Sequence, residues 1–357
     1  MREAAVLILK RKGLKVKVVA PNYYTSKVID NENYLITPFS ENKISLVFQH
    51  IGIYDDYLDK WVEVSFNYLK DKITKDDILF CTSGDDFGTI ILGYKLKIEI
   101  GCKFIVNHRD PLYKSKIYNQ KLSTKKYNIP HVSREKLEKK LLKRADLIIT
   151  SSSKYKTALE FKYPKLKNII NNNFGFIKDF KQTAQKTKKG KFEIIYGGNM
   201  GSSQSPEILA LAAIDLPNVK ATFIGDYKKN KKLCALKDHI NLLDTMSHDK
   251  YLEYVNENAD AGFLSLTNDL SEYCVPSKLY EYINLELPIL GYIKGQAKEI
   301  IVENEFGYVG NNIEDLKEKI IKLSNRENYN SISSSIIKNK YNWSMDKKLD
   351  EILKYLS

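Results

Sequence analysis

A lysine and a glutamate three residues apart form the first candidate binding site in this sequence. Lys278 and Glu281 lie in the segment 275–285, whose apolar residues recur at helical spacing, and Pro276 and Ser277 predict the helix start, with Ser277 as a cap. A helix start offers free N–H groups and a positive dipole end, and Lys278 adds a charge for phosphate. Glu281 shares that face and can accept two hydroxyl hydrogen bonds. The pair predicts a site for a nucleotide diphosphate with its ribose; the alternative is an ordinary surface helix.

A glycine-rich loop supports the first interpretation. The strand predicted at 192–196 runs directly into Gly197-Gly-Asn-Met-Gly201, and the helix 275–285 is followed by a short apolar strand at 288–291. In an open parallel sheet, loops at the carboxyl ends of strands converge on one crevice where the strand order reverses. We therefore expect the glycine loop and Lys278 to meet there.

The elements that must position these residues alternate between strand and helix along the whole chain. Strands are predicted at 15–20, 44–49, 77–81, 103–106, 146–150, 167–171, 192–196, 219–224, 240–243, 261–266, 288–291 and 307–309. Helices are predicted at 2–12, 56–71, 89–100, 134–144, 205–214, 248–256, 275–285, 313–324 and 342–356. This alternation is typical of an α/β fold with parallel sheets covered by helices on both faces.

The length of 357 residues predicts two domains. The polar, lysine-rich segment 178–191 is the best linker candidate. We expect an N-terminal domain at 1–180, a second domain at 190–335, and a C-terminal helix at 336–357, for which crossing back to the first domain is one option.

The charge is distributed unevenly between the two halves. Residues 1–190 carry 37 Lys and Arg against 20 Asp and Glu, whereas the remainder carries 20 against 24. A basic half suggests an anionic partner such as a membrane surface, a phospholipid-linked substrate or nucleic acid; the alternative is a solvated lysine-rich surface.

The four cysteines are widely spaced without a CxxC pair, which indicates reduced thiols in the cytosol and no metal site. The sequence has no signal segment and no apolar run of about 18 residues.

Several segments together resemble the family 4 glycosyltransferases. The resemblance rests on F-E-I-I-Y-G-G-N-M-G (192–201), V-P-S-K-L-Y-E-Y (275–282), L-P-I-L-G (287–291) and H-R-D-P (108–111), found in the family's order. It implies the GT-B fold, in which two Rossmann-like domains face each other. It also implies retaining transfer of a sugar from a nucleotide-diphosphate donor, of UDP or GDP type, and the similar enzymes act in bacterial surface-polysaccharide synthesis such as capsule or lipopolysaccharide assembly.

By position, the resemblance implies that Glu281 binds the donor ribose and Lys278 lies near the diphosphate. Gly198, Asn199 and Gly201 would let the backbone approach the phosphates or the transferred sugar. No metal or other cofactor is implied, because helix N-termini and basic side chains can offset the charge of the leaving diphosphate.

The first domain would add groups that handle the acceptor. His108 or Asp110 would orient the acceptor hydroxyl, and Arg109 would contact phosphate or fix Asp110. The alternative for His108 is a hydrogen-bonded loop histidine. Asp85 and Asp86 form another acidic pair, which we interpret as solvated.

The sequence also departs from the family pattern. Tyr273 stands where many members carry a first glutamate, and Glu272 is the nearest carboxylate. The usual Arg and Lys after the glycine loop are replaced in the segment 202–204 (Ser-Ser-Gln). Relatives also begin with a strand and a glycine-rich turn before the helix at 2–12, so we expect either a start upstream of Met1, which we favour, or an impaired form.

We therefore expect a cytoplasmic glycosyltransferase that uses a lipid-linked or oligosaccharide acceptor. Peripheral binding to the anionic inner face of the plasma membrane is one option. A catalytically impaired nucleotide- or membrane-binding subunit is the main alternative, followed by a nucleotide-sugar epimerase. A nucleic-acid partner is not expected, because no aromatic-basic motif of a known binding module is present.

Overall fold

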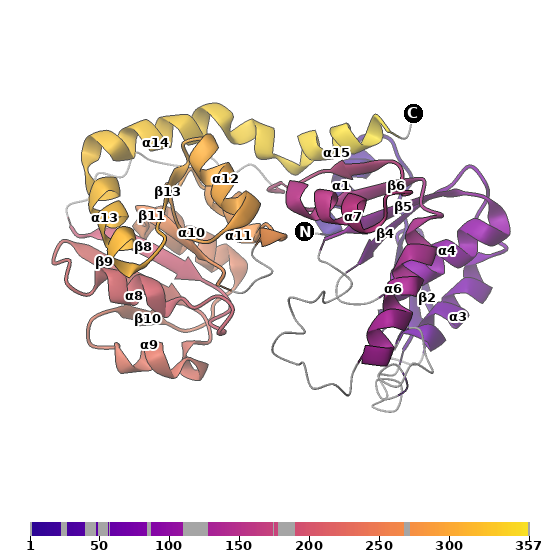
Figure 1. Ribbon diagram of the computed structural model, residues 1–357, viewed down its shortest axis with the longest axis horizontal. Helices are drawn as coiled ribbons and strands as arrows, with labels where there is room; N and C mark the ends of the chain where they lie inside the picture. The colour runs from indigo at the N-terminus through magenta and orange to yellow at the C-terminus, as the bar shows by residue number, and fades with distance from the viewer. Residues whose placement is uncertain are drawn as a thin grey trace. The chain divides into compact units, whose positions relative to one another are not determined.

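The computed structural model of the protein describes residues 2–22, 27–39, 48, 56, 58–83, 87–109, 128–173, 175–177, 190–267 and 272–355. The chain divides into two compact units (Figure 1). The first comprises Met1–Asn173 together with Leu349–Ser357, and the second comprises Phe174–Lys348. The predicted strand at 44–49 and the predicted linker at 178–191 fall almost entirely outside the described residues.

The second unit is built on a six-stranded parallel sheet with the order β10-β9-β8-β11-β12-β13. Its strands are β8 (Phe192–Gly197), β9 (Val219–Ile224), β10 (Asn241–Leu243), β11 (Ala261–Ser265), β12 (Ile289–Tyr292) and β13 (Gly307–Val309). The chain starts at the central strand β8, moves outward to β10, and then returns to β11 on the other side of β8. The strand order therefore reverses between β8 and β11, where an open α/β sheet forms a ligand crevice.

Helices cover this sheet and complete its core. The helices of the second unit are α8 (Glu207–Ala213), η1 (Tyr227–Lys229), α9 (Lys231–Ala235), α10 (His248–Asn258), α11 (Ser277–Asn284), α12 (Gly295–Glu303), α13 (Ile313–Ser324), α14 (Arg326–Asn339), η3 (Lys340–Trp343) and the start of α15 (Met345–Leu353), whose residues from Leu349 on belong to the first unit. α10 packs against β8, α11 against β11, and α12 against β12 and β13. The central strands are buried along almost their whole length, as expected for a doubly covered parallel sheet.

The first unit contains a four-stranded parallel sheet with the order β4-β5-β6-β7. Its strands are β4 (Ile78–Ser83), β5 (Lys103–His108), β6 (Leu147–Thr150) and β7 (Ile169–Asn171). The helices are α1 (Arg2–Arg11), α3 (Asp59–Leu69), α4 (Gly88–Ile100), α6 (Asn128–Leu142) and α7 (Ser153–Lys162). The predicted α/β fold with parallel sheets is confirmed.

A second, three-stranded sheet departs from strict strand–helix alternation. It has the order β1-β3-β2, from β1 (Val18–Asn22), β2 (Ile29–Asp30) and β3 (Tyr34–Pro38), and β2 runs antiparallel to β3. The side chain of Asn31 explains the reversal, because its Oδ1 accepts hydrogen bonds from the backbone N–H groups of Asn33 (2.9 Å) and Tyr34 (2.8 Å). Such an Asx turn folds the chain back without a helix.

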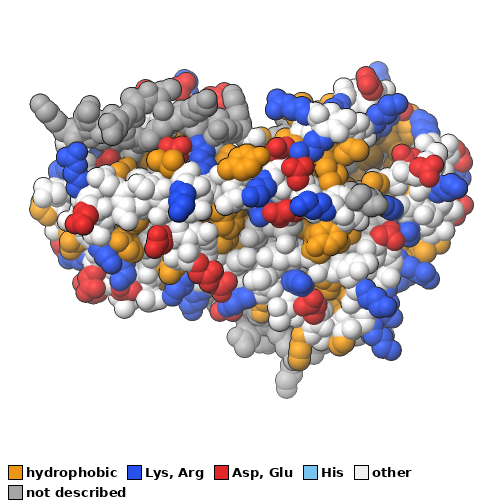
Figure 2. Space-filling model, turned by 90° about the horizontal axis from the view of Figure 1, so that it is seen from above, with side chains coloured by type: hydrophobic (Ala, Val, Ile, Leu, Met, Phe, Trp, Pro, Cys, Tyr) orange, Lys and Arg blue, Asp and Glu red, His pale blue; other side chains and the backbone are white. Residues whose placement is uncertain are grey.

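The surface shows charges of both signs. On the face drawn in Figure 2, basic and acidic side chains are interspersed, with hydrophobic side chains between them. Many lysines of the basic half of the chain, residues 1–190, lie at 114–126 and 178–189, outside the described residues. Among the helices that are described, none has the length and apolar character required to span a membrane.

Candidate active site

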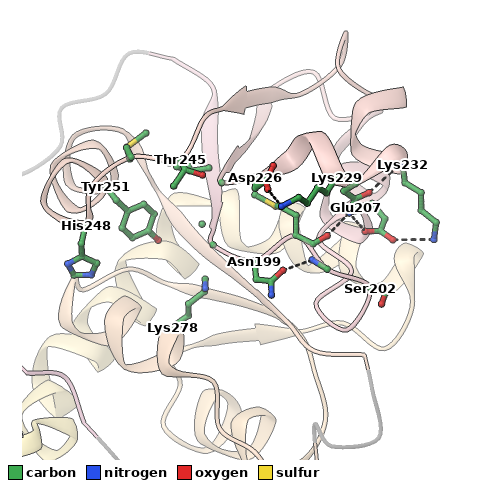
Figure 3. Close-up of a pocket in the computed structure, with 18 of the residues that line it drawn as sticks. Asn199, Ser202, Glu207, Asp226, Lys229, Lys232, Thr245, His248, Tyr251 and Lys278 are labelled. Atoms are coloured by element: carbon green, nitrogen blue, oxygen red, sulfur yellow. Dashed lines mark hydrogen bonds and ion pairs between the residues drawn. The ribbon is translucent and has the colours of Figure 1, made fainter. Parts of the chain in front are cut away.

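A pocket of about 880 Å³ opens at the carboxyl edge of the six-stranded sheet (Figure 3). Its walls come from the loops after β8, β9 and β10 and from α8, α10 and α11. Segments far apart in the sequence meet here because parallel strands end at the same edge. The predicted residues Gly198, Asn199, Gly201, Lys278 and Glu281 all line this pocket.

The glycine loop is a fixed backbone turn. Gly198 has φ of +120°, a conformation that side chains disfavour, and a Cβ atom there would collide with the Lys278 ammonium group. The Tyr196 hydroxyl donates a hydrogen bond to the Asn199 carbonyl (2.6 Å), and Asn199 Oδ1 accepts one from the Gly201 N–H (2.9 Å). These hydrogen bonds hold the loop in one conformation. The missing side chain at Gly198 leaves space for a ligand beside the loop backbone.

Lys278 enters the pocket from the first turn of α11. It is half-buried, and its Nζ lies 5.7 Å from the centre of the Tyr196 ring. Desolvation lowers the pKa of Lys278 below its usual 10.5, against an opposing attraction from the Glu281 carboxylate. Among the described residues, none forms an ion pair or hydrogen bond with this ammonium group. A cation held without a counter-ion is suited to bind an anion.

The start of α11 differs in detail from the prediction. Pro276 occupies the N-cap position and Ser277 is the first helical residue, so no side chain caps the helix. The expected cap by Ser277 is therefore wrong, because a serine inside the helix cannot reach the N–H groups of the first turn as a cap does.

The buried face of α11 ties the helix to the strands at the crevice. The Tyr282 ring packs over Gly262 of β11, where a Cβ atom would collide with it. The Tyr282 hydroxyl lies 3.1 Å from the Phe263 carbonyl of β11 and 3.4 Å from the Ile195 carbonyl of β8. The hydroxyl thus joins the two strands at the point where the strand order reverses.

Glu281 already has a partner at the pocket rim. Its Oε1 lies 2.8 Å from Nε2 of His248, the first residue of α10, and 22% of its side chain is exposed against 70% for His248. The carboxylate is thus accessible to a ligand, and the exposed histidine can leave it at little cost. His248 was not predicted as a site residue; its position after the short strand β10 becomes informative only once the strand order is known.

A further wall of the pocket, which was not predicted, comes from residues 226–232, which run from the end of β9 into the first turn of α9 and are called the β9–α9 segment below. Lys232 pairs with the buried Glu207 (3.2 Å), and Lys229 pairs with Asp226 (2.6 Å). Asn230 Nδ2 donates to Glu207 Oε2 (3.2 Å) and to the carbonyl of Met200 in the glycine loop (3.0 Å). The segment is thereby anchored to the glycine loop.

Glu272 and the segment 202–204, of which Ser202 lines the pocket, add no charged side chain to the pocket lining. Glu272 does not line the pocket; its backbone packs against Gly295 at the start of α12. The Ser203 carbonyl accepts a hydrogen bond from the Thr267 N–H (2.8 Å), and the Gln204 carbonyl accepts one from Ser265, so the segment 202–204 is tied to the end of β11.

In the first unit, His108 ends β5 and is fully buried. Its Nδ1 lies 3.0 Å from the Tyr155 hydroxyl of α7. This contact favours the alternative of a hydrogen-bonded histidine, and the acceptor role of His108 stays a prediction. The carbonyl of the neighbouring Arg109 accepts a hydrogen bond from Ser151. Asp110 and the acidic pair at 85–86 lie outside the described residues.

The arrangement can hold a diphosphate ester with a hydroxyl-bearing group beside it. The glycine loop and a lysine from the first turn of α11 line the space that phosphates would fill, and a carboxylate lies one helical turn beyond that lysine. No group of three or more His, Cys, Asp or Glu side chains that could hold a metal ion occurs in the described part of the chain.

The fold is that of the GT-B glycosyltransferases, and solved structures of this class align with most of the chain. Trehalose-6-phosphate synthase, studied for glycosyl transfer with retention, aligns with a TM-score of 0.71 and 12% identity over 98% of this chain and 95% of its own. Alr3699/HepE of Anabaena in complex with UDP-glucose aligns with a TM-score of 0.64 and 13% identity over 95% and 99%. The apo form of the lipopolysaccharide outer core galactosyltransferase WaaB aligns with a TM-score of 0.59 and 16% identity over 91% and 85%.

Within this fold, residues 177–343 match the family of glycosyl transferases group 1. The matched stretch contains the whole pocket and most of the second unit. The match of this stretch to the group 1 glycosyl transferases and the GT-B fold of the chain confirm the coarser part of the resemblance. No curated protein matches this sequence.

Proposed function

We propose that this protein is a retaining glycosyltransferase, of family 4 type, that transfers a sugar from a nucleotide-diphosphate donor to a lipid-linked or oligosaccharide acceptor. Bacterial surface-polysaccharide synthesis is the proposed setting. Three likenesses support the proposal: the synthase studied for retention, HepE with UDP-glucose, and the lipopolysaccharide galactosyltransferase. The HepE complex with UDP-glucose favours a donor of UDP type.

The observation that carries the proposal is that Lys278 and Glu281 share one face of α11, beside the glycine loop. The two residues are three apart, so one helix face presents both a cation for the diphosphate and a carboxylate for the ribose hydroxyls. Lys278 would bind the diphosphate, and Glu281 would accept hydrogen bonds from the ribose after exchanging its contact with His248.

In the proposed reaction, the bond between the anomeric carbon and the diphosphate oxygen breaks, and the diphosphate leaves with the electron pair. The acceptor hydroxyl forms the new bond on the same face of the sugar, and its proton passes to an oxygen of the leaving diphosphate. Negative charge grows on the leaving diphosphate, where Lys278 and the N–H groups of the glycine loop would stabilise it most in the transition state. His108 and Asp110 remain the proposed groups that orient the acceptor, and no cofactor enters the proposal.

A thermal-shift screen with UDP, GDP, ADP and CMP tests the donor site. A ligand present at about 100 times its dissociation constant stabilises the folded protein by roughly 2.7 kcal/mol. We expect a shift with one diphosphate that Glu281→Ala abolishes. Glu318→Ala is the matched control, because Glu318 is an exposed glutamate of α13 away from the pocket. The absence of any shift in the native protein would refute the nucleotide site.

A binding subunit without turnover is the second candidate. It is favoured by Glu272 lying outside the pocket lining and by the uncharged segment 202–204. Release of UDP from UDP-sugars separates the two: diphosphate binding with no release above the level of Glu281→Ala would favour the binding subunit. Peripheral membrane association is a separate proposal, and failure to sediment with vesicles containing anionic phospholipid at low salt would refute it.

A further inference from the structure

The lysines that follow β9, in η1 and at the start of α9, line the same pocket as Lys278. Lys229, Lys231 and Lys232 belong to this lining, whereas their neighbour Lys228 does not and instead pairs with Asp244 (2.8 Å). They come from a different part of the sheet edge from α11, so cations enter the pocket from two separate elements (Figure 3).

The pocket lining contains more lysines than carboxylates. Of its carboxylates, Glu207 pairs with Lys232, Asp226 with Lys229, and Glu281 with a histidine. Lys231, like Lys278, forms no ion pair with any residue that the structure describes. The Lys229–Asp226 pair is largely exposed, with 86% and 51% of the side chains accessible, so it is weak and can exchange for a phosphate contact.

Asn230 holds these lysines next to the glycine loop. Its Oδ1 accepts hydrogen bonds from the N–H groups of Lys232 and Leu233 (both 3.1 Å), which caps α9. Its Nδ2 donates to the Met200 carbonyl of the glycine loop (3.0 Å). Lys229 and Lys231 flank this anchored residue, so both side chains start from a backbone that is fixed beside the loop.

The backbones of the two loops also touch directly. Gly225, which follows β9, has φ of +151°, and a Cβ atom there would collide with the Gly198 carbonyl. The space between the loops is therefore narrow, and a ligand seated on the glycine loop lies within reach of side chains from the β9–α9 segment. The segment 202–204, which follows the glycine loop, is uncharged and supplies no cation of its own.

We propose that Lys229 and Lys231 bind the diphosphate group of the ligand together with Lys278. This inference rests on the proposed nucleotide-diphosphate site and assigns its second cationic wall to the β9–α9 segment. Lys229 and Lys231 would supply the positive charge for the diphosphate that the uncharged segment 202–204 does not supply.

Titration calorimetry with UDP, UMP and uridine tests the assignment. In the double variant Lys229→Ala/Lys231→Ala we expect the Kd for UDP to rise about tenfold or more, the Kd for UMP to rise less, and that for uridine to change by less than about twofold. The matched control is Lys228→Ala/Lys237→Ala, which removes two exposed lysines of the same region that do not line the pocket. Lys229→Arg/Lys231→Arg should retain UDP binding.

The outcomes separate this inference from the proposed function. If the native protein binds UDP and the alanine double variant binds it equally well, the lysine wall is refuted while the nucleotide site stands. If the control double variant weakens UDP binding as much, general surface charge is responsible and the assignment is also refuted. If the native protein binds neither UDP nor GDP, the proposed function fails, and the inference fails with it.

Discussion

Replacing Asn230 by alanine should cost more stability than the loss of a helix cap alone. Asn230 caps α9 through two N–H groups, and its amide also donates to Met200 in the glycine loop and to the buried Glu207. Asn325 offers a matched control, because it caps α14 through the N–H groups of Glu327 (3.0 Å) and Asn328 (3.3 Å).

The magnitude follows from counting these bonds. Loss of an asparagine cap costs about 1 kcal/mol, which is the expected effect of Asn325→Ala. Asn230→Ala loses in addition two hydrogen bonds to partly buried acceptors, each worth about 1 kcal/mol. We therefore expect Asn230→Ala to lower the free energy of unfolding by roughly 3 kcal/mol, about 2 kcal/mol more than the control.

Urea unfolding followed by tryptophan fluorescence measures this difference. The chain has two tryptophans, and Trp343 lies in the second unit. A Trp61→Phe background leaves Trp343 as the reporter of the unit that contains Asn230. Equal losses of stability in Asn230→Ala and Asn325→Ala would show that the bonds from Asn230 to Met200 and Glu207 contribute nothing. Asn230 would then not anchor the β9–α9 segment to the glycine loop.

Two further predictions concern the glycine loop and the lysine beside it. Gly198→Ala should lower the free energy of unfolding by roughly 1–3 kcal/mol, because φ is +120° there, and urea unfolding measures this loss. The new methyl group should also displace Lys278 and weaken UDP binding. Calorimetry measures the Kd for UDP, and an unchanged value would contradict the expected displacement. UDP affinity should fall as the pH rises through the pKa of Lys278, which burial holds below 10.5, because only the protonated form attracts phosphate. Lys278→Arg should lose this pH dependence, since arginine stays charged, and a native affinity that is flat across that pH range would contradict the assignment.

The sequence allowed α11 and the strand after it to be predicted closely. The predicted helix near 275–285 is α11, and the predicted strand at 288–291 is β12. Both predictions succeeded because each element carries a local signal: apolar residues at helical spacing in one, and a short apolar run between turn residues in the other. The glycine loop was located for the same reason.

Other features depend on contacts between distant segments, which a local pattern does not reveal. The segment at 227–232 (Tyr-Lys-Lys-Asn-Lys-Lys) has the composition of a solvated loop. It becomes a pocket wall only because β9 lies next to β8 in the sheet. Helix α14 was not predicted, since its serines and asparagines have low helix propensity; packing of its buried residues Ile332 and Ile336 stabilises it instead.

The two faces of α11 differ in which amino-acid substitutions they can accept during evolution. One face carries Tyr282 and the apolar side chains that fasten the helix to β8 and β11, and the other presents Lys278 and Glu281 to the pocket. Anchoring and recognition thus reside in different residues of one short helix. If the proposed function holds, substitutions on the pocket face alter donor preference without loosening the sheet, so new specificities are accessible by single mutational steps through folded intermediates. Substitutions on the anchoring face have no such freedom, because they disturb the frame on which every ligand contact depends.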